Sequence, residues 1–425
     1  MQTPATLVEW LEYIERIHPK SIELGLDRVL VVKRRLARRS AATIVTVAGT
    51  NGKGSTCAML ESVLLAAGHR VGMYSSPHLL RYNERVRVNG APVEDASLCR
   101  AFEQVEAARD GVALTYFEFG TLAAWIIFAG EPLDALILEV GMGGRLDAVN
   151  AFDADCAVLT SIAIDHMDYL GHTREQIGLE KAGIFRAGRP AIVSDPEPPA
   201  SVIEHARAIG ADLQRLGREF GYADERGQWT FWGRRGRQAG LAHPALRGAC
   251  QLRNASACLA ALDALAERLP AGMNEVRKGL ATVQWPGRFQ VLPGRPAVVL
   301  DVAHNPEAAA MLAQNLADMG SYPATHAVFG MLRDKDIEGV CAALKGQVGA
   351  WYAASLSGAR GAQAATLAQA IRSTYPGVEV GLFDSPRSAF EAACKRAGGD
   401  DRIVVFGSFY TVAEVMAAQA PGSGR

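Results

Sequence analysis

The sequence has few cysteines, almost no net charge and no long apolar run, and each of these absences argues against a class of protein. Its 425 residues include seven cysteines, none in a C-x-x-C pair, so we expect reduced thiols rather than a zinc site or a disulfide framework. The formal net charge is −1, which gives no electrostatic case for a nucleic-acid partner. The acidic, amphipathic N-terminus does not resemble a signal peptide, and the apolar run at 119–130 is too short to span a bilayer. We therefore expect a cytoplasmic protein without a membrane partner.

The sequence does contain an alternation of strand-like and helix-like segments, over a length sufficient for two or three domains. A β-branched run at 43–48 and continuous apolar runs at 133–140 and 157–164 are typical of parallel strands buried on both faces. Helical spacing follows the first run, at 55–67. Prolines and glycines then cluster at 284–296, in QWPGRFQVLPGRP, which is typical of an interdomain linker.

This pattern predicts an α/β fold in two domains. We expect a P-loop NTPase-like domain over residues 1–287, with a mainly parallel sheet flanked by helices, and a smaller Rossmann-like α/β domain over residues 288–425. The strands expected in the smaller domain lie at 297–300, 327–329, 351–354 and 403–406. The Gly- and Arg-rich segment 213–246 predicts a β-hairpin-like excursion without chemistry.

A glycine-rich loop lies between the first expected strand and helix, in TIVTVAGTNGKGSTCAML at 43–60. It departs from the common G-x-x-x-x-G-K-[ST] pattern, because Gly54 follows Lys53 and the hydroxyl of Ser55 comes one place late. Glycines let backbone N–H groups approach an anion, the next helix directs its positive end there, and Lys53 adds a charge. The loop therefore predicts a site for ATP or GTP phosphates; a glycine turn with a solvated lysine is the alternative.

Ligands of open α/β sheets bind beyond the carboxyl ends of the strands, where two titratable residues are expected. Glu139 ends the strand in LDALILE, and its carboxylate suits Mg²⁺, with a strand-end salt bridge as the alternative. His166 is expected to end the strand in SIAIDHMDYLG; its residue type alone favours a hydrogen-bonding role over a Mg²⁺ ligand. Thr173 and Gln176 have capping-box spacing and predict a helix that carries Lys181.

Nine motifs in order resemble the folylpolyglutamate synthase/dihydrofolate synthase family of Mur-ligase-like amide ligases. They are AGTNGKGS, YSSPHLLRYNERVRVNG, LTYFEFGTLAAW, LEVGMGGRLDAVN, SIAIDHMDYLG, EKAGIFR, PGRFQV, DVAHNPEAA and GMLRDKD. The likeness runs from about residue 7 to about residue 415, and a glycine after the loop lysine is this family's form of the motif. It implies a bifunctional bacterial enzyme, with an N-terminal domain of the Mur ligase central type. Such an enzyme uses ATP to add L-glutamate to dihydropteroate, and to tetrahydrofolate and its polyglutamates, through an acyl phosphate.

The resemblance also implies roles for individual residues. In the loop it assigns ATP phosphates to Thr50, Asn51, Gly52 and Lys53, with Gly54 and Ser55 beside them, and elsewhere it assigns ATP contacts to Asn254, Arg288 and Asp301. One or two Mg²⁺ ions are assigned to Ser76, Glu139 and His166. Lys181 matches a lysine that CO₂ converts to N6-carboxylysine, and with Lys53 and His304 it forms the expected catalytic set. Glutamate binding or productive closure is linked with Asp301, His304 and Ser408.

The expected folate site combines three stretches of the family's pterin pocket. They are Ile22, Glu23, Leu24 and Gly25; Thr115, Tyr116, Phe117 and Glu118; and Leu146, Asp147 and Ala148. A ring such as Phe117 can stack on a flat pterin, and a carboxylate such as Asp147 can accept its N–H donors. For Phe117 alone, a core aromatic is the alternative. The family further suggests a monomer.

Other functions remain as alternatives. The nearest is a folylpolyglutamate synthase without the second activity. A cell-wall Mur ligase would carry an N-terminal UDP-binding domain, for which a loop that begins by residue 49 leaves no room. A P-loop kinase or switch would not need a second domain with DVAHNP, and a decayed binding protein would not need Lys53, Glu139 and His166.

Overall fold

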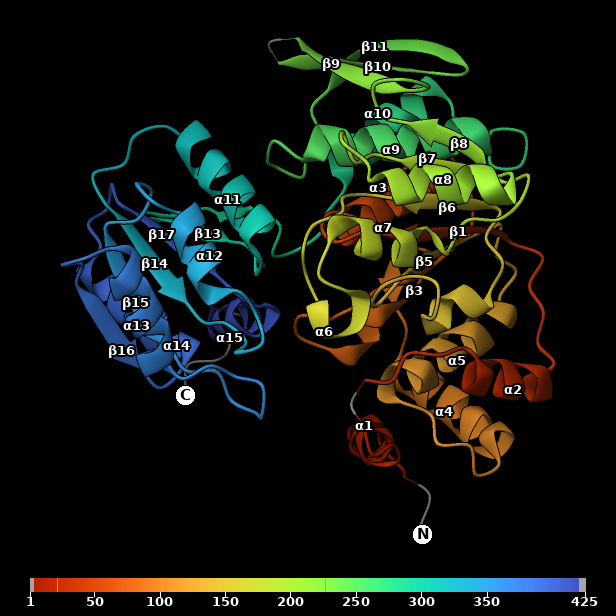
Figure 1. Ribbon diagram of the computed structural model, residues 1–425, viewed down its shortest axis with the longest axis horizontal. Coiled ribbons are helices and arrows are strands. Elements are labelled where there is room, and N and C mark those ends of the chain that lie inside the picture. The colour runs from red at the N-terminus through yellow and green to blue at the C-terminus, as the bar shows by residue number, and fades with distance from the viewer. Residues whose placement is uncertain (1–3, 21, 226, 420–425) are drawn as a thin grey trace. The chain divides into compact units, whose positions relative to one another are not determined.

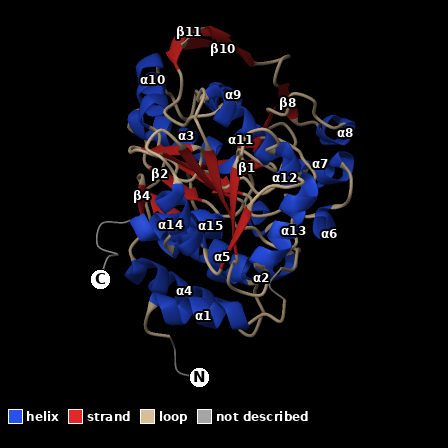
Figure 2. Cartoon of the chain, turned by 90° about the vertical axis from the view of Figure 1, so that its left-hand side faces the viewer, coloured by secondary structure: helices blue, strands red, loops and turns tan. Residues whose placement is uncertain are grey.

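The computed structural model describes residues 4–20, 22–225 and 227–419, and it divides into two compact units. The first comprises Met1–Ala245 and Leu252–Val283, and the second Leu246–Gln251 and Gln284–Arg425. Figure 1 shows the order of the elements along the chain, and Figure 2 shows the strands in red with helices in blue around them. The boundary after Val283 coincides with the start of the proline-rich stretch 284–296.

An eight-stranded sheet forms the core of the first unit, in the order β4-β3-β2-β5-β1-β6-β7-β8. Its strands are β1 Thr43–Ala48, β2 Val71–Tyr74, β3 Val86–Val88, β4 Ala91–Pro92, β5 Ala135–Glu139, β6 Cys156–Leu159, β7 Pro190–Val193 and β8 Asp212–Arg215. From β2 to β8 in that order neighbouring strands are parallel, whereas β3 and β4 extend the edge antiparallel. β1, β5 and β6 are buried throughout, as expected for strands covered on both faces.

Helices cover this sheet. They are α1 Leu7–Arg16, α2 Asp27–Leu36, α3 Lys53–Ala66, α4 Asp95–Arg109, α5 Tyr116–Ala129, α6 Met167–Leu170, α7 Arg174–Ala182, α8 Ala200–Ile209, α9 Gln251–Ala264 and α10 Met273–Thr282, with 3-10 turns η1 Tyr82–Arg85 and η2 Ala148–Ala151. α3 is buried along most of its length and crosses α10 closely. Ser62 donates a hydrogen bond to the Gly279 carbonyl over 2.8 Å, and a Cβ on Gly279 would lie 2.5 Å from the Cα of Val63. This contact fixes the helix whose N-terminus follows the glycine-rich loop.

The apolar run at 119–130 forms most of α5, which is buried in the core of the first unit. Phe119 of this helix and Phe102 of α4 lie against the fully buried Trp10, with ring centroids 6.4 and 5.9 Å from it. Within the described residues, no helix is long and apolar enough to cross a membrane.

The expected hairpin at 213–246 is wrong in two respects. Leu213 belongs to β8, at the edge of the main sheet. The rest forms a three-stranded antiparallel sheet of β9 Gly221–Glu225, β10 Gln228–Gly233 and β11 Gly236–Ala242. Trp229 and Phe231 of the central strand are fully buried, and such an apolar strand is better stabilised with a neighbour on each side than in an isolated hairpin.

The expected strand at 157–164 is confirmed only over residues 157–159, and the expectation that His166 lies at its end is wrong. β6 ends at Leu159; Thr160 N still donates to the Ala48 carbonyl of β1 over 2.9 Å, and from Ser161 onward the backbone bonds to loops. The Ser161 carbonyl accepts from Thr50 N over 2.6 Å, and Ile162 N donates to the Asp195 carboxylate over 2.7 Å. His166 has a φ of +53° and immediately precedes α6.

The second unit contains a six-stranded sheet in the order β12-β13-β17-β14-β15-β16, parallel except for the edge strand β12. Its strands are β12 Gln290–Leu292, β13 Ala297–Leu300, β14 Thr325–Phe329, β15 Ala350–Ala354, β16 Val380–Phe383 and β17 Arg402–Phe406. Its helices are α11 Pro306–Asp318, α12 Ile337–Ala343, α13 Ala364–Thr374, α14 Pro386–Arg396 and α15 Phe409–Gln419. The strands expected at 297–300, 327–329, 351–354 and 403–406 are confirmed, and the two-domain α/β fold class is correct.

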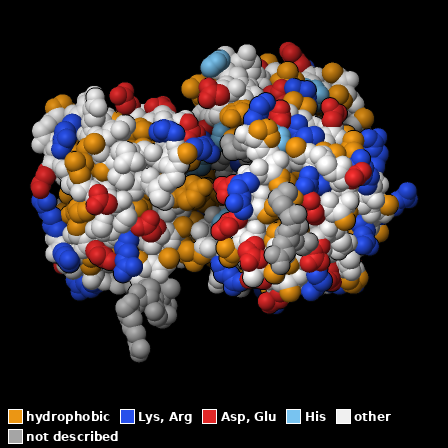
Figure 3. Space-filling view, turned by 90° about the horizontal axis from the view of Figure 1, so that it is seen from below, with side chains coloured by type: hydrophobic (Ala, Val, Ile, Leu, Met, Phe, Trp, Pro, Cys, Tyr) orange, Lys and Arg blue, Asp and Glu red, His pale blue; other side chains and the backbone are white. Residues whose placement is uncertain are grey.

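The distribution of charged side chains over the surface is consistent with the net charge of −1. Basic and acidic side chains are interspersed over the face shown in Figure 3. No disulfide joins the cysteines of the described residues.

Candidate functional site

The glycine-rich loop follows β1 and leads directly into α3. Gly49 has a φ of +150° and Gly52 a φ of +88°, conformations that L side chains rarely adopt. A Cβ on Gly49 would lie 1.8 Å from the Thr160 hydroxyl, and a Cβ on Gly52 would lie 2.6 Å from the side-chain oxygen of Asn254. Both glycines are therefore required by close approach as well as by backbone conformation, and Asn254 of α9 lies against the loop.

The segment after β6 holds this loop in place. Besides the Thr50–Ser161 backbone bond, Asn51 N donates to the Ser161 hydroxyl over 3.2 Å, and the Thr160 hydroxyl donates to the Asn51 carbonyl over 2.6 Å. Ala163 N donates to the Thr50 hydroxyl over 3.0 Å. Sequence reasoning missed Thr160 and Ser161; their only signal was that polar residues directly follow an apolar strand.

Two lysines converge on the loop. Lys53 Nζ donates to the carbonyls of Gly49 and Thr50 over 3.0 and 3.2 Å, and Lys181 Nζ donates to the Gly49 carbonyl over 2.9 Å. Lys181 is 4% exposed on α7, the helix that the capping box of Thr173 predicted. Its neighbour Glu180 is paired with Arg145 at 2.8 Å, so a plain Lys181–Glu180 pair does not describe this site. Both Nζ atoms thus meet at one carbonyl of the loop, and Lys53 brings there the positive charge that a polyphosphate requires.

Ser76 and Glu139 also lie together. Glu139 is the last residue of β5 and is 3% exposed, and one of its carboxylate oxygens accepts from Ser76 N over 3.2 Å. His166 lies three positions beyond Ala163, the residue that contacts Thr50, and its ring nitrogen Nε2 is 3.9 Å from the Asp165 carboxylate.

The donor types of this set fit Mg²⁺. Among the residues that the structure describes, no three His, Cys, Asp or Glu side chains form a group that could hold a metal. The expected set contains only two such residues, Glu139 and His166, with the hydroxyl of Ser76. Mg²⁺ in nucleotide sites commonly takes one or two carboxylates and completes its octahedron with waters and substrate phosphates. The buried carboxylate of Glu139, which accepts from the backbone N–H of Ser76 in the unit that holds the phosphate loop, matches that mode.

The three expected folate stretches lie in contact with one another. Gly25 N donates to the Leu146 carbonyl over 3.1 Å, which joins the first stretch to the third. Arg28 lies 3.3 Å from Glu23 and 2.9 Å from Glu118, which joins the first to the second. Thr115 and Glu118 also form the capping box of α5. The Phe117 ring lies 5.8 Å from the Tyr74 ring and packs so closely on Gly141 that a Cβ there would lie 2.6 Å from it.

Asp147 is the most perturbed carboxyl group of this region. It begins η2, where its two oxygens accept from Met142 N over 2.9 Å and from Val149 N over 3.0 Å. Burial raises the pKa of Asp147 to about 7, although these backbone donors act in the opposite direction. Near neutral pH the group therefore exchanges between an acceptor and a hydrogen-bond donor.

A second cluster, which sequence reasoning missed, is formed by side chains from the segment after Ser76 and from the first turn of α5. His78 Nδ1 accepts a hydrogen bond from Arg85 Nε over 2.9 Å, and the guanidinium carbon of Arg85 lies 5.3 Å from the Tyr82 ring centroid and 5.6 Å from that of Tyr116. Burial and the charge of Arg85 lower the pKa of His78 to about 4. Only the motif YSSPHLLRYNERVRVNG as a whole, and no local spacing, drew attention to these residues.

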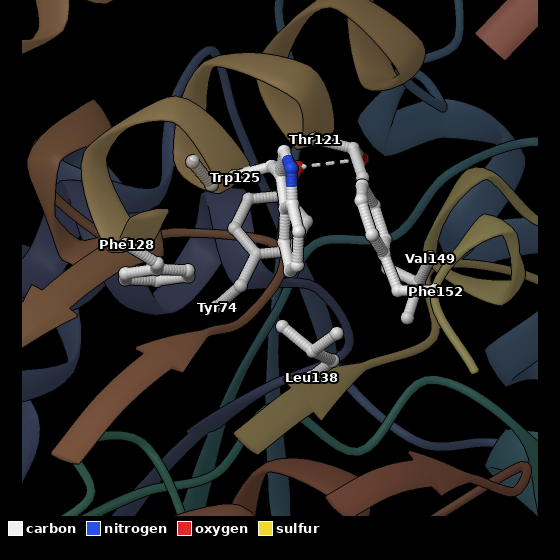
Figure 4. A pocket seen from close by; sticks show the side chains of 8 residues that line it. Tyr74, Thr121, Trp125, Phe128, Leu138, Val149 and Phe152 are labelled. Atoms are coloured by element: carbon white, nitrogen blue, oxygen red, sulfur yellow. Dashed lines mark hydrogen bonds between the residues drawn. The ribbon is translucent and has the colours of Figure 1, made fainter. Parts of the chain in front are cut away.

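An apolar cavity lies deeper in the first unit (Figure 4). It is lined by Tyr74, Thr121, Ala124, Trp125, Phe128, Leu138, Val149 and Phe152. Thr121 donates to the Tyr74 hydroxyl over 3.3 Å, and the rings of Trp125 and Phe152 stack at 4.2 Å. Its volume of about 10 Å³ is at the lower limit for a single water, so it is a packing defect and not a substrate pocket.

In the second unit, candidate residues gather around one unexpected aromatic ring, that of Phe409. The guanidinium carbon of Arg288 lies 5.0 Å from the Phe409 ring centroid, and the His304 ring lies 6.2 Å from it. Ser408 is adjacent in the chain and buried. His304 Nδ1 lies 2.8 Å from the Val302 carbonyl, which can only accept, so the proton is on Nδ1.

Asp301 anchors the loop that carries His304. Its oxygens accept from Phe289 N and Ala303 N, each over 2.8 Å, and burial raises its pKa. Asn305 then caps α11 and Pro306 occupies its first turn, so the motif DVAHNP is a strand-end turn followed by a helix start.

Comparisons with known proteins agree along nearly the whole chain. The Mur ligase middle domain matches residues 127–262, and the Mur ligase, glutamate ligase domain, matches residues 287–409. The dihydrofolate synthase/folylpolyglutamate synthase of Escherichia coli (strain K12) is 47% identical over 98% of this chain and 96% of its own length. A structure of E. coli FolC in complex with DHPP and ADP covers 98% of each chain with a TM-score of 0.94 and 46% identity. A bifunctional folylpolyglutamate synthase/dihydrofolate synthase with Mn, AMPPNP and L-glutamate bound has a TM-score of 0.90 and 46% identity, over 98% of this chain and 99% of that one.

Proposed function

Because this chain belongs to the dihydrofolate synthase/folylpolyglutamate synthase family of ATP-dependent ligases, we propose that it joins L-glutamate to dihydropteroate and to the glutamate tails of tetrahydrofolate. The observation that carries the bifunctional form is the 47% identity, over 98% of the chain, to an enzyme named for both activities. Residues 1–287 bind ATP and folate in this proposal, and residues 288–425 form the glutamate ligase domain.

The chemistry begins with transfer of the ATP γ-phosphate to the carboxylate of the acid substrate. The backbone of Thr50, Asn51 and Gly52 holds the phosphates, and Lys53 places its charge on the group being transferred. The amine of L-glutamate then attacks the acyl phosphate, an amide bond forms, and inorganic phosphate leaves. Asn254, Arg288 and Asp301 contact ATP, whereas His304 and Ser408, together with Asp301, bind L-glutamate.

Ser76, Glu139 and His166 would hold Mg²⁺ in this reaction. The ion would supply positive charge to the phosphates. The buried carboxylate of Glu139 and its bond from Ser76 N are the observations that support this assignment.

Lys181 is proposed to be carboxylated by CO₂ at Nζ. Its burial, its bond to the Gly49 carbonyl and the separate pairing of Glu180 with Arg145 support a role at the phosphate loop. Carboxylation converts a cation into an anion with two oxygens. These oxygens attract a hard cation, whereas an ammonium would repel it.

The acid substrate is proposed to occupy the three contacting stretches at residues 22–25, 115–118 and 146–148. Their mutual contacts support a single site, with Phe117 as the ring for stacking. The seven scattered cysteines, none in a C-x-x-C pair, support a reducing compartment, hence the cytoplasm. The chain is proposed to act as a monomer, which light scattering can test.

The decisive experiment incubates the protein with ATP, Mg²⁺ and ¹⁴C-labelled glutamate, with dihydropteroate or tetrahydrofolate as the acceptor. We expect label in both products and ADP release that depends on glutamate. Label in tetrahydrofolate products alone would reduce the function to folylpolyglutamate synthase. Label in neither product, from folded and Mg²⁺-supplied protein, would reject the proposal, and ADP release indifferent to glutamate would indicate a kinase or switch.

A further inference from the structure

Three arginines, Arg81, Arg85 and Arg87, lie in the segment 81–87 that runs through η1 into β3, and they differ in their partners. Arg81 lies 3.0 Å from the Asp95 carboxylate, and Arg87 lies 3.0 Å from the buried Glu61. Arg85, between them, has no ion pair with a carboxylate among the residues that the structure describes. An arginine remains charged at any physiological pH, so the middle position holds a cation without an acid of its own.

The surroundings of Arg85 are neutral and aromatic. Its Nε donates to His78 Nδ1 over 2.9 Å, so that nitrogen acts as an acceptor and carries no proton. Its guanidinium lies against the rings of Tyr82 and Tyr116, 5.3 and 5.6 Å from their centroids. The adjacent carboxylate of Glu84 is occupied elsewhere, because it accepts from the backbone N–H groups of residues 79, 80 and 81 over 2.7 to 2.8 Å.

We propose that Arg85 binds a carboxylate group of the acid substrate. This inference rests on the proposed function, because Tyr116, one of its two ring partners, belongs to a proposed folate stretch. The bond to His78 fixes the Nε edge, and the Nη1 and Nη2 donors at the other end of the guanidinium match the spacing of the two oxygens of a carboxylate. Stacking between rings removes rotamer freedom before the ligand arrives, so little further entropy is lost on binding.

The anion could also belong to ATP or to free glutamate, and the neighbours of Arg85 argue for the acid substrate. Tyr116 begins α5, whose first turn lies in the cluster formed by Glu23, Arg28 and Glu118. The phosphate loop has its own cation in Lys53. We therefore expect changes at Arg85 to alter the KM for the acid and to leave the KM values for ATP and glutamate within about twofold.

The test compares Arg85→Met with Arg81→Met, a matched control in the same segment. Binding of dihydropteroate and of its carboxamide is measured by calorimetry without ATP, so that no turnover is required. A hydrogen bond to a charged group contributes about 1.5–3 kcal/mol, so Arg85→Met should bind the acid roughly 10- to 150-fold more weakly. The carboxamide should lose much less affinity, and Arg81→Met should bind both ligands as the unmodified protein does.

Two other outcomes would each overturn the inference. Equal weakening of acid and carboxamide would mean that Arg85 only packs the aromatic wall, and unchanged affinity would mean that it does not reach the ligand. Should Arg85→Met fail to fold, Arg85→Gln makes the same comparison, because a glutamine amide can still donate to His78. A failure of the proposed ligase function would be seen separately, as absence of label in the turnover assay. The role of Arg85 is tested by binding alone, through the preference of the protein for the acid over the carboxamide.

Discussion

The side-chain amine of Lys181 and the backbone carbonyl of Gly49 share a 2.9 Å hydrogen bond, although the two residues lie on α7 and on the loop after β1. Lys53 donates to the same carbonyl over 3.0 Å. One oxygen atom thus positions two amines, and the removal of either lysine changes the charge at the same point of the loop.

Lys181→Ala should lose most of the ligase activity, because the proposed carbamate and its charge are lost. If the carbamate is the active form, formate or acetate should restore part of the rate by supplying a carboxylate to the vacated space. Steady-state rates with and without the added acid measure this. Lys278→Ala, at an exposed lysine on α10, is the control and should behave as the unmodified protein. A fully active Lys181→Ala variant would refute the role.

Lys53→Ala should lower kcat by about 10²-fold or more, because positive charge on the transferring phosphoryl group is removed. Lys53 is only partly buried and bonds to its own loop, so the thermal midpoint of unfolding should change little. Rates and thermal unfolding are measured on the same preparation. Activity within a few-fold of the unmodified protein would contradict the assignment of the loop.

Gly49→Ala should destabilise the protein more than Gly68→Ala and should also abolish activity. Both glycines have positive φ, so each alanine adds backbone strain of about 1–2 kcal/mol. At Gly68 no atom lies within 4 Å of the new Cβ, whereas at Gly49 the Thr160 hydroxyl lies 1.8 Å from it. Urea unfolding separates the clash from the strain. Equal losses of free energy in the two variants would show that the loop can move away from Thr160.

The raised pKa of Asp147 predicts a specific pH dependence of stability. Its pKa is about 7 in the folded protein against an ordinary value of 3.8 for an aspartate, so the folded state binds more protons between these values. Its contribution to the free energy of unfolding therefore falls as pH rises from about 4 to about 7, and the full penalty is present above that range.

Asp147→Asn removes this titration, although it also removes one backbone acceptor at every pH. The free energy of unfolding of the unmodified protein, relative to the variant, should decrease between about pH 5 and about pH 7. Urea denaturation at several pH values measures the difference. A difference that is constant with pH would show that Asp147 titrates normally.

The parts of the fold that the sequence predicted are those whose cause is local. β1 at Thr43–Ala48 is a β-branched run, β13 at Ala297–Leu300 is an uninterrupted apolar run, and the helix of Lys181 begins at a capping box. The end of β6 at Leu159 was not predictable in this way, because it depends on bonds between Ser161 and a loop more than a hundred residues earlier in the chain.

The same distinction holds within the candidate site. Glycine conformation and strand ends indicated Lys53 and Glu139, since both follow from short patterns. Among the described residues Arg85 has no carboxylate partner, because Asp95 pairs with Arg81 and Glu61 pairs with Arg87. No spacing in the sequence indicates these pairings. Phe409 was missed for a related reason. It contacts Arg288 and His304, which lie more than a hundred residues earlier in the sequence.

The short segment Leu246–Gln251 belongs to the second compact unit, although the chain then returns to the first unit until Val283. Ala249 N donates to the side chain of Asn315 in α11 over 2.9 Å, and a Cβ on Gly248 would lie 2.7 Å from the same amide. A gene fragment that starts at residue 284 would therefore encode the second unit without one of its own pieces. Domain exchange between relatives of this chain would need a junction before residue 246, with the helices α9 and α10 carried along as an insertion.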